Sequence, residues 1–241
     1  MRNFLLTKIR LSVYFWIFFV VSLVLSITLP GYTFTAGALT LFSVNSFLYG
    51  FYISPILGAQ KSRIEEMHKI VRTEANALFS LVLQLKKLPD ALHDKLQTMI
   101  EDYVRAKVHQ HGLNSGEKEY EALITYCVDY KGDHKEQIDK TLEALVTNQQ
   151  NRTNLSMQMN SKVFTNEWHI TAILFSITLG FILSLDIGKS LIFHVVRALL
   201  CTALTMLVLI LVKLSTLTHK KAKQMWEPLK KLVDTNFYRT D

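Results

Sequence analysis

The feature that most constrains this chain is a set of four long apolar blocks. They run from Leu11 to Leu29, from Tyr32 to about Leu57, from about Trp168 to Leu185 and from about Leu191 to Val212. Each block is long enough to cross a hydrocarbon layer of about 30 Å as a helix that rises about 1.5 Å per residue. With 49% hydrophobic and only 20% charged residues among 241, the sequence predicts four transmembrane helices and argues against a soluble enzyme.

Positively charged residues lie on one side of these blocks. They precede the first block, follow the second and follow the fourth: Arg2, Lys8, Arg10; Lys61, Arg63, Lys69, Arg72; Lys213, Lys220, Lys221, Lys223. The positive-inside rule then predicts a multi-pass protein of a plasma membrane or bacterial inner membrane, with both termini and the middle segment cytoplasmic. The net charge of +7 belongs to these membrane ends, which argues against a nucleic-acid partner.

The segment between the second and third blocks has the pattern of a helical bundle. Apolar residues recur every three or four positions along four stretches, Ile64 to Leu85, Leu92 to Val104, Tyr120 to Cys127 and Ile138 to Leu155, as in amphipathic helices. The first stretch begins so soon after the second block that the two can form one continuous helix. We therefore predict an all-α integral membrane protein in which two transmembrane hairpins, 11–57 and 166–213, flank a cytosolic helical bundle at 58–165.

A basic tail at 214–241 completes this predicted organisation. Its run from Lys220 to Lys231 contains Trp226, which fits an amphipathic helix lying on anionic lipid. The same charges are equally expected from positive-inside topology alone.

One face of the second apolar block is small and polar. Seven residues recur along it every three or four positions: Thr33, Gly37, Thr40, Ser43, Phe47, Gly50 and Ser54. In a ring of identical subunits this face could line a pore, where hydroxyls replace part of an ion's water shell and Phe47 forms an apolar constriction. Alternatively, it is a surface of small residues that lets helices approach closely. Asn45, on an adjacent face, either bonds to another helix or faces the pore.

Two ionisable residues lie within the fourth apolar block. His194 and Arg197 must find polar partners or reach an aqueous surface. Asp186, in the turn before this block, is a candidate partner for them, and anchoring by an Arg197 side chain that extends to the membrane surface is the alternative that we favour.

The sequence offers no support for enzymatic chemistry. It has no phosphate-binding loop, nucleophile elbow or zinc-protease motif, and His109-Gln110-His111 lacks the spacing or the Cys partners of a metal site. Cys127 and Cys201 are expected to behave as small apolar residues. We predict a protein that is not an enzyme and that uses no cofactor or metal.

The order of these features resembles the bacterial bestrophin-like membrane family, which is catalogued largely as a domain of unknown function. The resemblance covers roughly residues 35 to 213 and is carried by short motifs: Arg72-Thr73-Glu74-Ala75-Asn76-Ala77, Leu88-Pro89, Tyr103, Asn151-Arg152 and the leading Trp168 of the third block. Glu74, Asn76, Arg152 and Trp168 are the motif residues that we carry forward. Bestrophins themselves are pentameric anion channels with aromatic residues at the neck of the second span, which implies such a role for Phe47. The acidic calcium-binding cluster of bestrophins has no match in this chain.

These observations lead to a homo-oligomeric ion channel as the first functional hypothesis, with a pentamer favoured. Anions are slightly favoured, because the first, second and fourth blocks lack acidic residues and basic residues flank the cytoplasmic side. A cation channel for potassium remains open, since neutral hydroxyls and aromatic rings also line such pores. The hypothesis from another class is a membrane-anchored scaffold whose bundle recruits a protein partner. The expected partners of the channel are further copies of the chain, the lipid bilayer and inorganic ions.

Overall fold

A computed structural model describes residues 9–110, 116–188, 190–218 and 224–234. Every regular element in these ranges is a helix, and an isolated bridge between Tyr32 and Leu185 is the one β-type pairing found there. The all-helical prediction is therefore confirmed. The chain divides into two compact units, which are described separately below.

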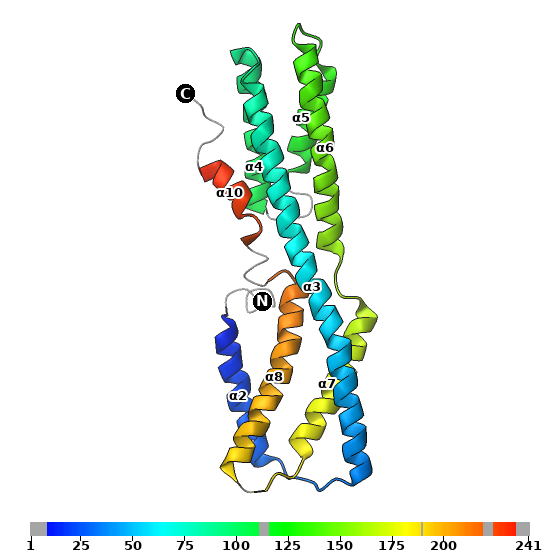
Figure 1. Ribbon diagram of the computed structural model, residues 1–241. Coiled ribbons are helices and arrows are strands. Elements are labelled where there is room, and N and C mark those ends of the chain that lie inside the picture. Colours follow the sequence, from blue (N-terminus) through cyan, green and yellow to red (C-terminus); the bar gives the residue numbers. More distant parts are fainter. Residues whose placement is uncertain (1–8, 111–115, 189, 219–223, 235–241) are drawn as a thin grey trace. The chain divides into compact units, whose positions relative to one another are not determined.

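The first unit comprises the described residues of 1–62 and 162–220. It contains α2 (Leu11–Thr28), the beginning of α3 (Ala36–Leu85), α7 (Thr165–Ser184) and α8 (Leu191–Ser215) (Figure 1). A small apolar core joins three of these helices, formed by Tyr49, Ile53, Val163 and Leu211 with partly buried Trp168, Leu174 and Phe175 around them. The α7 helix begins where the Phe164 N–H donates to Glu167 Oε2 at 2.9 Å, which satisfies one of the donors left open at a helix start.

Four helical segments are long and apolar enough to cross a membrane: Leu11–Thr28, Ala36–Leu85, Lys135–Ser184 and Leu191–Ser215. Their most apolar windows are only 11% buried in three cases and 28% in the fourth. Large side chains such as Trp16, Val20 and Ile27 on α2 remain more than half exposed. Apolar surface of this extent is not stable in water, so these helices belong to a membrane protein.

Two connecting segments of the first unit are tied together. Tyr32 N–H donates to Ser184 O at 2.8 Å, and Asp186 N–H donates to Tyr32 O at 3.1 Å. A Cβ on Gly31 would come within 2.7 Å of Asp186 Cα, so only glycine allows this approach of one backbone to the other.

The second unit comprises the described residues of 63–161 and 221–241. It contains the rest of α3, then α4 (Asp90–Gln110), α5 (Glu117–Asp129), α6 (Lys135–Asn160) and α10 (Glu227–Asp234). The four helices predicted for the bundle are all present. Their apolar stripes form its core, with fully buried Met67, Leu78, Leu96, Ile100, Leu123, Ile138 and Leu145.

The tail segment packs on the bundle of this unit. Met225, Trp226 and Leu229 are buried, and α10 contacts α4. The amphipathic helix expected in the basic tail therefore exists, and its apolar side is used within the protein. Lys220 and Lys221, at the start of that predicted run, lie outside the described residues.

The helix α3 is the continuous helix that the sequence allowed, and it contributes residues to both units. It passes through Pro55, which has no backbone N–H. The carbonyl of Phe51, four residues earlier, therefore has no helical donor.

Candidate functional site

The predicted polar stripe lies on a face of α3 that the first unit does not cover. Gly37, Thr40, Ser43, Phe47, Gly50 and Ser54 are all exposed. The other side of the helix is buried, with Tyr49 and Ile53 each 3% exposed in the apolar core. Thr33 is also exposed, but it lies before the first residue of α3, so it belongs to the connecting segment rather than to the helical stripe.

The glycines of this stripe are not needed for packing within the protomer. A Cβ added to Gly37 or to Gly50 would meet no atom within 4 Å. Close helix contacts of the small-residue type would bring neighbouring atoms much nearer. The space beside these glycines is therefore available to a lumen or to another copy of the chain.

The hydroxyls of the stripe point their hydrogens back into the helix. Thr40 Oγ1 donates to Ala36 O at 3.0 Å, and Ser43 Oγ donates to Leu39 O at 3.0 Å. Each hydroxyl therefore presents an oxygen lone pair to the exposed face and can act there as a hydrogen-bond acceptor.

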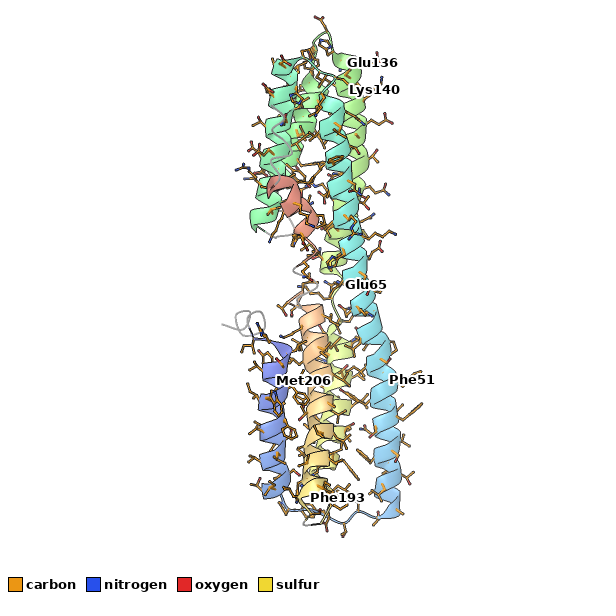
Figure 2. The ribbon with its side chains drawn as sticks, turned by 60° about the vertical axis from the view of Figure 1, so that its left-hand side comes forward. Phe51, Glu65, Glu136, Lys140, Phe193 and Met206 are labelled. Carbon is orange, nitrogen blue, oxygen red and sulfur yellow. The ribbon has the colours of Figure 1, made fainter. Side chains whose placement is uncertain are left out.

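Phe47 is 68% exposed, and a second aromatic ring stands one turn further along. Phe51 is 69% exposed, and its ring centroid lies 6.0 Å from that of Phe47. Figure 2 shows Phe51 projecting away from the other helices of the first unit. Phe51 is not among the predicted lining residues, although its i, i+4 spacing from Phe47 indicates that the two rings share a face of the helix.

Asn45 faces α7 and not the exposed stripe. Its Nδ2 donates to Thr178 Oγ1 at 2.8 Å and to Leu174 O at 3.3 Å. The amide thus joins α3 to α7 within one protomer, a common use of amides between helices in membranes.

The partner expected for Arg197 is wrong. Its guanidinium donates to Leu185 O at 2.8 Å, to Leu183 O at 3.1 Å, to Ser26 Oγ at 2.7 Å and to Ser26 O. Asp186 instead accepts a hydrogen bond from Gly188 N–H at 3.0 Å. The last carbonyls of α2 and α7 carry partial negative charge and lack helical donors, so they satisfy the buried Arg197 without an ionised acid.

A polar network lies in the core of the second unit, centred on Glu74 of α3. Tyr103 OH, from α4, donates to Glu74 Oε1, and Lys107 Nζ lies 2.5 Å from the same oxygen and 2.9 Å from Tyr103 OH. All three side chains are at most 6% exposed. Burial, and then the charge of Glu74, raise the pKa of Tyr103 well above its usual value, whereas burial lowers the pKa of Lys107. Glu74 Oε2 is buried without a partner among the described residues.

Arg152, from α6, borders this network. Its guanidinium carbon lies 4.0 Å from the centroid of the Tyr120 ring and 5.3 Å from that of Tyr103. It also pairs with Glu117 Oε2 at 3.0 Å. Four helices therefore meet around one set of charges and aromatic rings.

The four family-motif residues do not form one site. Glu74 and Arg152 come together through the Tyr103 ring of the second unit. Asn76 is exposed on α3, and Trp168 packs against the apolar core of the first unit. Lys107 and Glu117 complete the charges around Glu74 and Arg152, but neither residue stands out in the sequence from the other charged residues of its helix.

Within the described ranges, no group of three or more His, Cys, Asp and Glu side chains is arranged to hold a metal ion. His111 of the His109-Gln110-His111 sequence lies outside the described residues, and the side chain of His109 is not described either. Cys127 and Cys201 are both buried and free.

Comparison with known proteins finds one family. The model of the Bestrophin-like domain matches residues 13–219, which extends the resemblance at both ends. No curated protein and no solved structure matches the chain. The family is known as channels and not as enzymes, which suggests an ion-channel kind of function. With most of its length matched by the domain, the chain belongs to the bestrophin-like family.

Proposed function

We propose that the protein is a homo-oligomeric ion channel in which α3 lines the pore. The observation that carries this proposal is the exposed polar face of α3, because its residues serve no packing purpose within the protomer. A single helix face cannot enclose a pathway, so several copies must surround an axis. A pentamer is the favoured ring.

The proposed channel crosses a plasma membrane or bacterial inner membrane with two hairpins, α2 with the first part of α3 and α7 with α8. Both termini and the bundle lie in the cytoplasm, because the basic residues concentrate there. Lys61, Lys69 and Arg72 follow the apolar part of α3.

Phe47 forms the constriction of this pore, and Phe51 extends it by one helical turn. Apolar rings of this kind close a narrow pore by expelling water from it. The two exposed rings stack along the helix at 6.0 Å, so they act as one apolar segment rather than as two separate gates.

Anions are slightly favoured as the permeating ions. The apolar parts of α2, α3 and α8 contain no acidic residue, and the basic residues beside them raise the local concentration of anions. A cation channel is the second candidate, and a specific observation favours it. The Thr40 and Ser43 hydroxyls and the carbonyl of Phe51 all offer oxygen acceptors, which bind cations.

The first test is the number of subunits in the detergent-purified protein, measured by native mass and by particle images. A closed ring of four or more copies with α3 innermost supports the pore. A monomer or a two-fold dimer without an axial cavity contradicts it and favours the scaffold hypothesis.

The second test measures ion flux in liposomes that contain the purified protein. Phe47→Ala should increase the leak, because a wider constriction keeps its water. Phe193→Ala is the matched control, since Phe193 is 54% exposed on α8 and outside the proposed lining. Equal flux in Phe47→Ala and the unchanged protein would contradict the gate. Reversal potentials in chloride and potassium gradients then decide between the two ion classes.

A further inference from the structure

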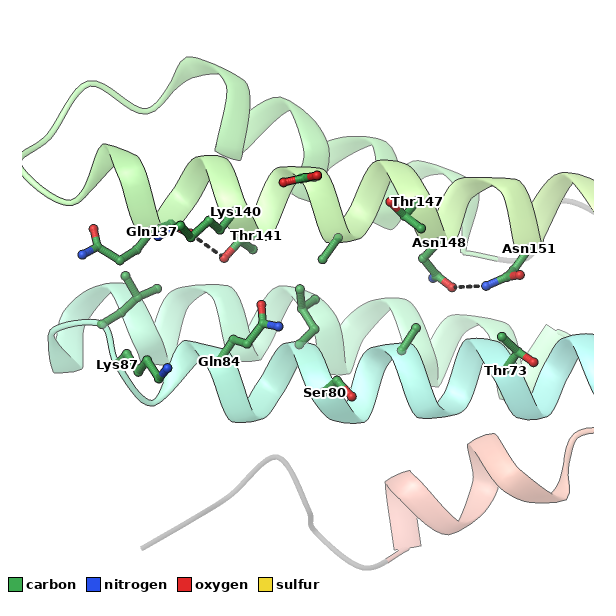
Figure 3. Close-up of a pocket in the computed structure, with 15 residues that line it drawn as sticks. Thr73, Ser80, Gln84, Lys87, Gln137, Lys140, Thr141, Thr147, Asn148 and Asn151 are labelled. Atoms are coloured by element: carbon green, nitrogen blue, oxygen red, sulfur yellow. Dashed lines mark hydrogen bonds between the residues drawn. The ribbon is translucent and has the colours of Figure 1, made fainter.

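A groove with both polar and apolar lining residues runs between α3 and α6 of the second unit (Figure 3). Its volume is about 820 Å³, within the range of about 300–1,000 Å³ that is usual for ligand pockets. Residues of the two helices face each other across it, with Lys87, Gln84 and Gln137 toward one end and Thr73 and Asn151 toward the other.

Polar side chains line much of the groove beside Ala77, Leu81, Leu88 and Ala144, whereas bundle helices normally meet through apolar side chains alone. Thr141 and Asn148 line it although each is only 3% exposed. Asn148 Oδ1 accepts from Asn151 Nδ2 at 3.1 Å, and Asn148 Nδ2 donates to Tyr120 OH at 3.3 Å. These side chains are held in place by the protein itself, so the groove presents a fixed polar surface.

Two lysines mark one end of the groove. Lys87 lies in the turn after α3 and has no ion-pair partner within the part of the chain that the structure describes. Lys140, on α6, lies 2.8 Å from Glu136. No arginine lines the groove, so an anion bound there would meet lysine rather than the planar guanidinium that pairs with carboxylates and phosphates alike. Lysine acts as a point charge, which suits the tetrahedral oxygens of a phosphate.

The remaining polar groups of the groove suit a ligand that carries several hydroxyl groups. Gln84, Ser80 and Glu143 also line the groove. Amides and hydroxyls can both donate and accept, and a carboxylate accepts, so together they can bind hydroxyl groups in either role. Ala77 and Ala144 add apolar surface that can cover the C–H faces of a sugar ring.

We propose that this groove binds a sugar phosphate, with the phosphate at Lys87 and the sugar along Gln84, Ser80 and Glu143. This site is distinct from the proposed pore, and its occupancy does not depend on ion conduction. Asn148 joins the groove to Tyr120, whose ring lies against Arg152.

The experiment is isothermal titration of the full chain in detergent with glucose 6-phosphate and ribose 5-phosphate, compared with glucose and inorganic phosphate. We expect saturable binding of the sugar phosphates and at least tenfold weaker binding of glucose and of phosphate. A response to inorganic phosphate as strong as to the sugar phosphates would reduce the groove to an anion site and overturn the proposal. So would the absence of binding by both sugar phosphates.

Variants of groove residues test whether the ligand binds in the groove. Lys87→Ala should weaken binding about tenfold or more, because a charge-assisted contact is lost. Lys86→Ala is the matched control, since Lys86 is the adjacent exposed lysine and does not line the groove. Ser80→Leu should abolish binding by filling the groove, with helix content checked by circular dichroism. Equal effects of the two lysine variants, or an unchanged affinity in folded Ser80→Leu, would show that the ligand binds elsewhere.

Discussion

Arg197 in the first unit and Lys107 in the second unit are both buried cations, but they are satisfied in different ways. Arg197 binds backbone carbonyls and the Ser26 hydroxyl, none of which is ionised. Lys107 binds the carboxylate of Glu74 and a tyrosine hydroxyl. Around Arg197 only one charge is removed from water. Around Lys107 two opposite charges are removed from water, and each is stabilised by the other. Removal of one partner of Lys107 should therefore lower the free energy of unfolding more than removal of one partner of Arg197.

The largest expected effect comes from Glu74→Ala. This change leaves Lys107 buried without an anion, and breaking a buried pair from one side costs about 3–5 kcal/mol. Denaturant unfolding in detergent, together with hydrogen exchange in α3 and α4, measures the loss. Glu101→Ala is the control, since its pair with Arg105 is partly exposed and is worth about 1 kcal/mol or less. Equal unfolding midpoints for these two variants would contradict the comparison.

The second largest expected effect is that alkaline pH lowers the stability of the bundle more than that of the region around Arg197. Burial raises the pKa of Tyr120 from 10.0 to about 12. Between these values the unfolded chain loses this proton and the folded bundle keeps it, so the free energy of unfolding falls as pH rises, by about 2–3 kcal/mol in total at about 1.4 kcal/mol per pH unit. The lowered pKa of Lys107 acts in the opposite direction.

The Tyr120→Phe variant isolates this effect, because it removes the titrating hydroxyl and leaves Lys107 in place. Its bundle should lose less stability than the unchanged protein between pH 10 and pH 12, as measured by hydrogen exchange in α5 and α6. Parallel pH profiles for the two proteins would show that Tyr120 does not titrate in this window. The carbonyls around Arg197 have no such dependence, since they do not ionise.

A smaller loss is expected from Arg197→Lys. The charge remains, but one ammonium cannot reach the carbonyls of Ser26, Leu183 and Leu185 together as the guanidinium does. One or more buried carbonyls lose their donor, at about 1–3 kcal/mol. Thermal unfolding measures the change, with exposed Arg10→Lys as control. A loss as large as that of Glu74→Ala would reverse the proposed order of the two regions.

The smallest effect is expected from Ser26→Ala. The Ser26 hydroxyl lies 2.7 Å from Arg197 Nε and 3.0 Å from His194 Nδ1, but the carbonyls continue to hold the guanidinium. We expect a loss of about 1 kcal/mol, the usual contribution of one hydrogen bond. Ser22→Ala, at the other buried serine of α2, is the reference. An unfolding temperature equal to that of the reference would remove Ser26 from the set of residues that stabilise Arg197.

The helices could be predicted from the sequence because their signals are local. Apolar spacing located α4, α5 and α6, and the short interval after the second block allowed the continuous α3. The grouping of the polar residues on one face of α3 was also predicted, since helical periodicity places them on the same side of the helix. Thr33 was the exception, because the helix begins only at Ala36.

Partners of buried charges could not be predicted in the same way. The sequence suggested Asp186 for Arg197 because acids are visible in a sequence, whereas free carbonyls exist only where a helix ends against another element. Glu74 and Arg152 were named as motif residues, but the aromatic rings that bring them together come from α4 and α5. Such pairings depend on how four helices pack, and no local pattern encodes that.

The contact between Ser26 and Arg197 also sets an order of events during synthesis. The two residues are 171 positions apart in the chain. At about 5–20 residues per second, a ribosome takes roughly 10–30 s to pass from one to the other. For that time the end of α2 has no guanidinium to bind. In the proposed topology, water at the membrane surface would meet its carbonyls, and the nascent α2 would have to hold its own position in the bilayer until the last long helix arrives.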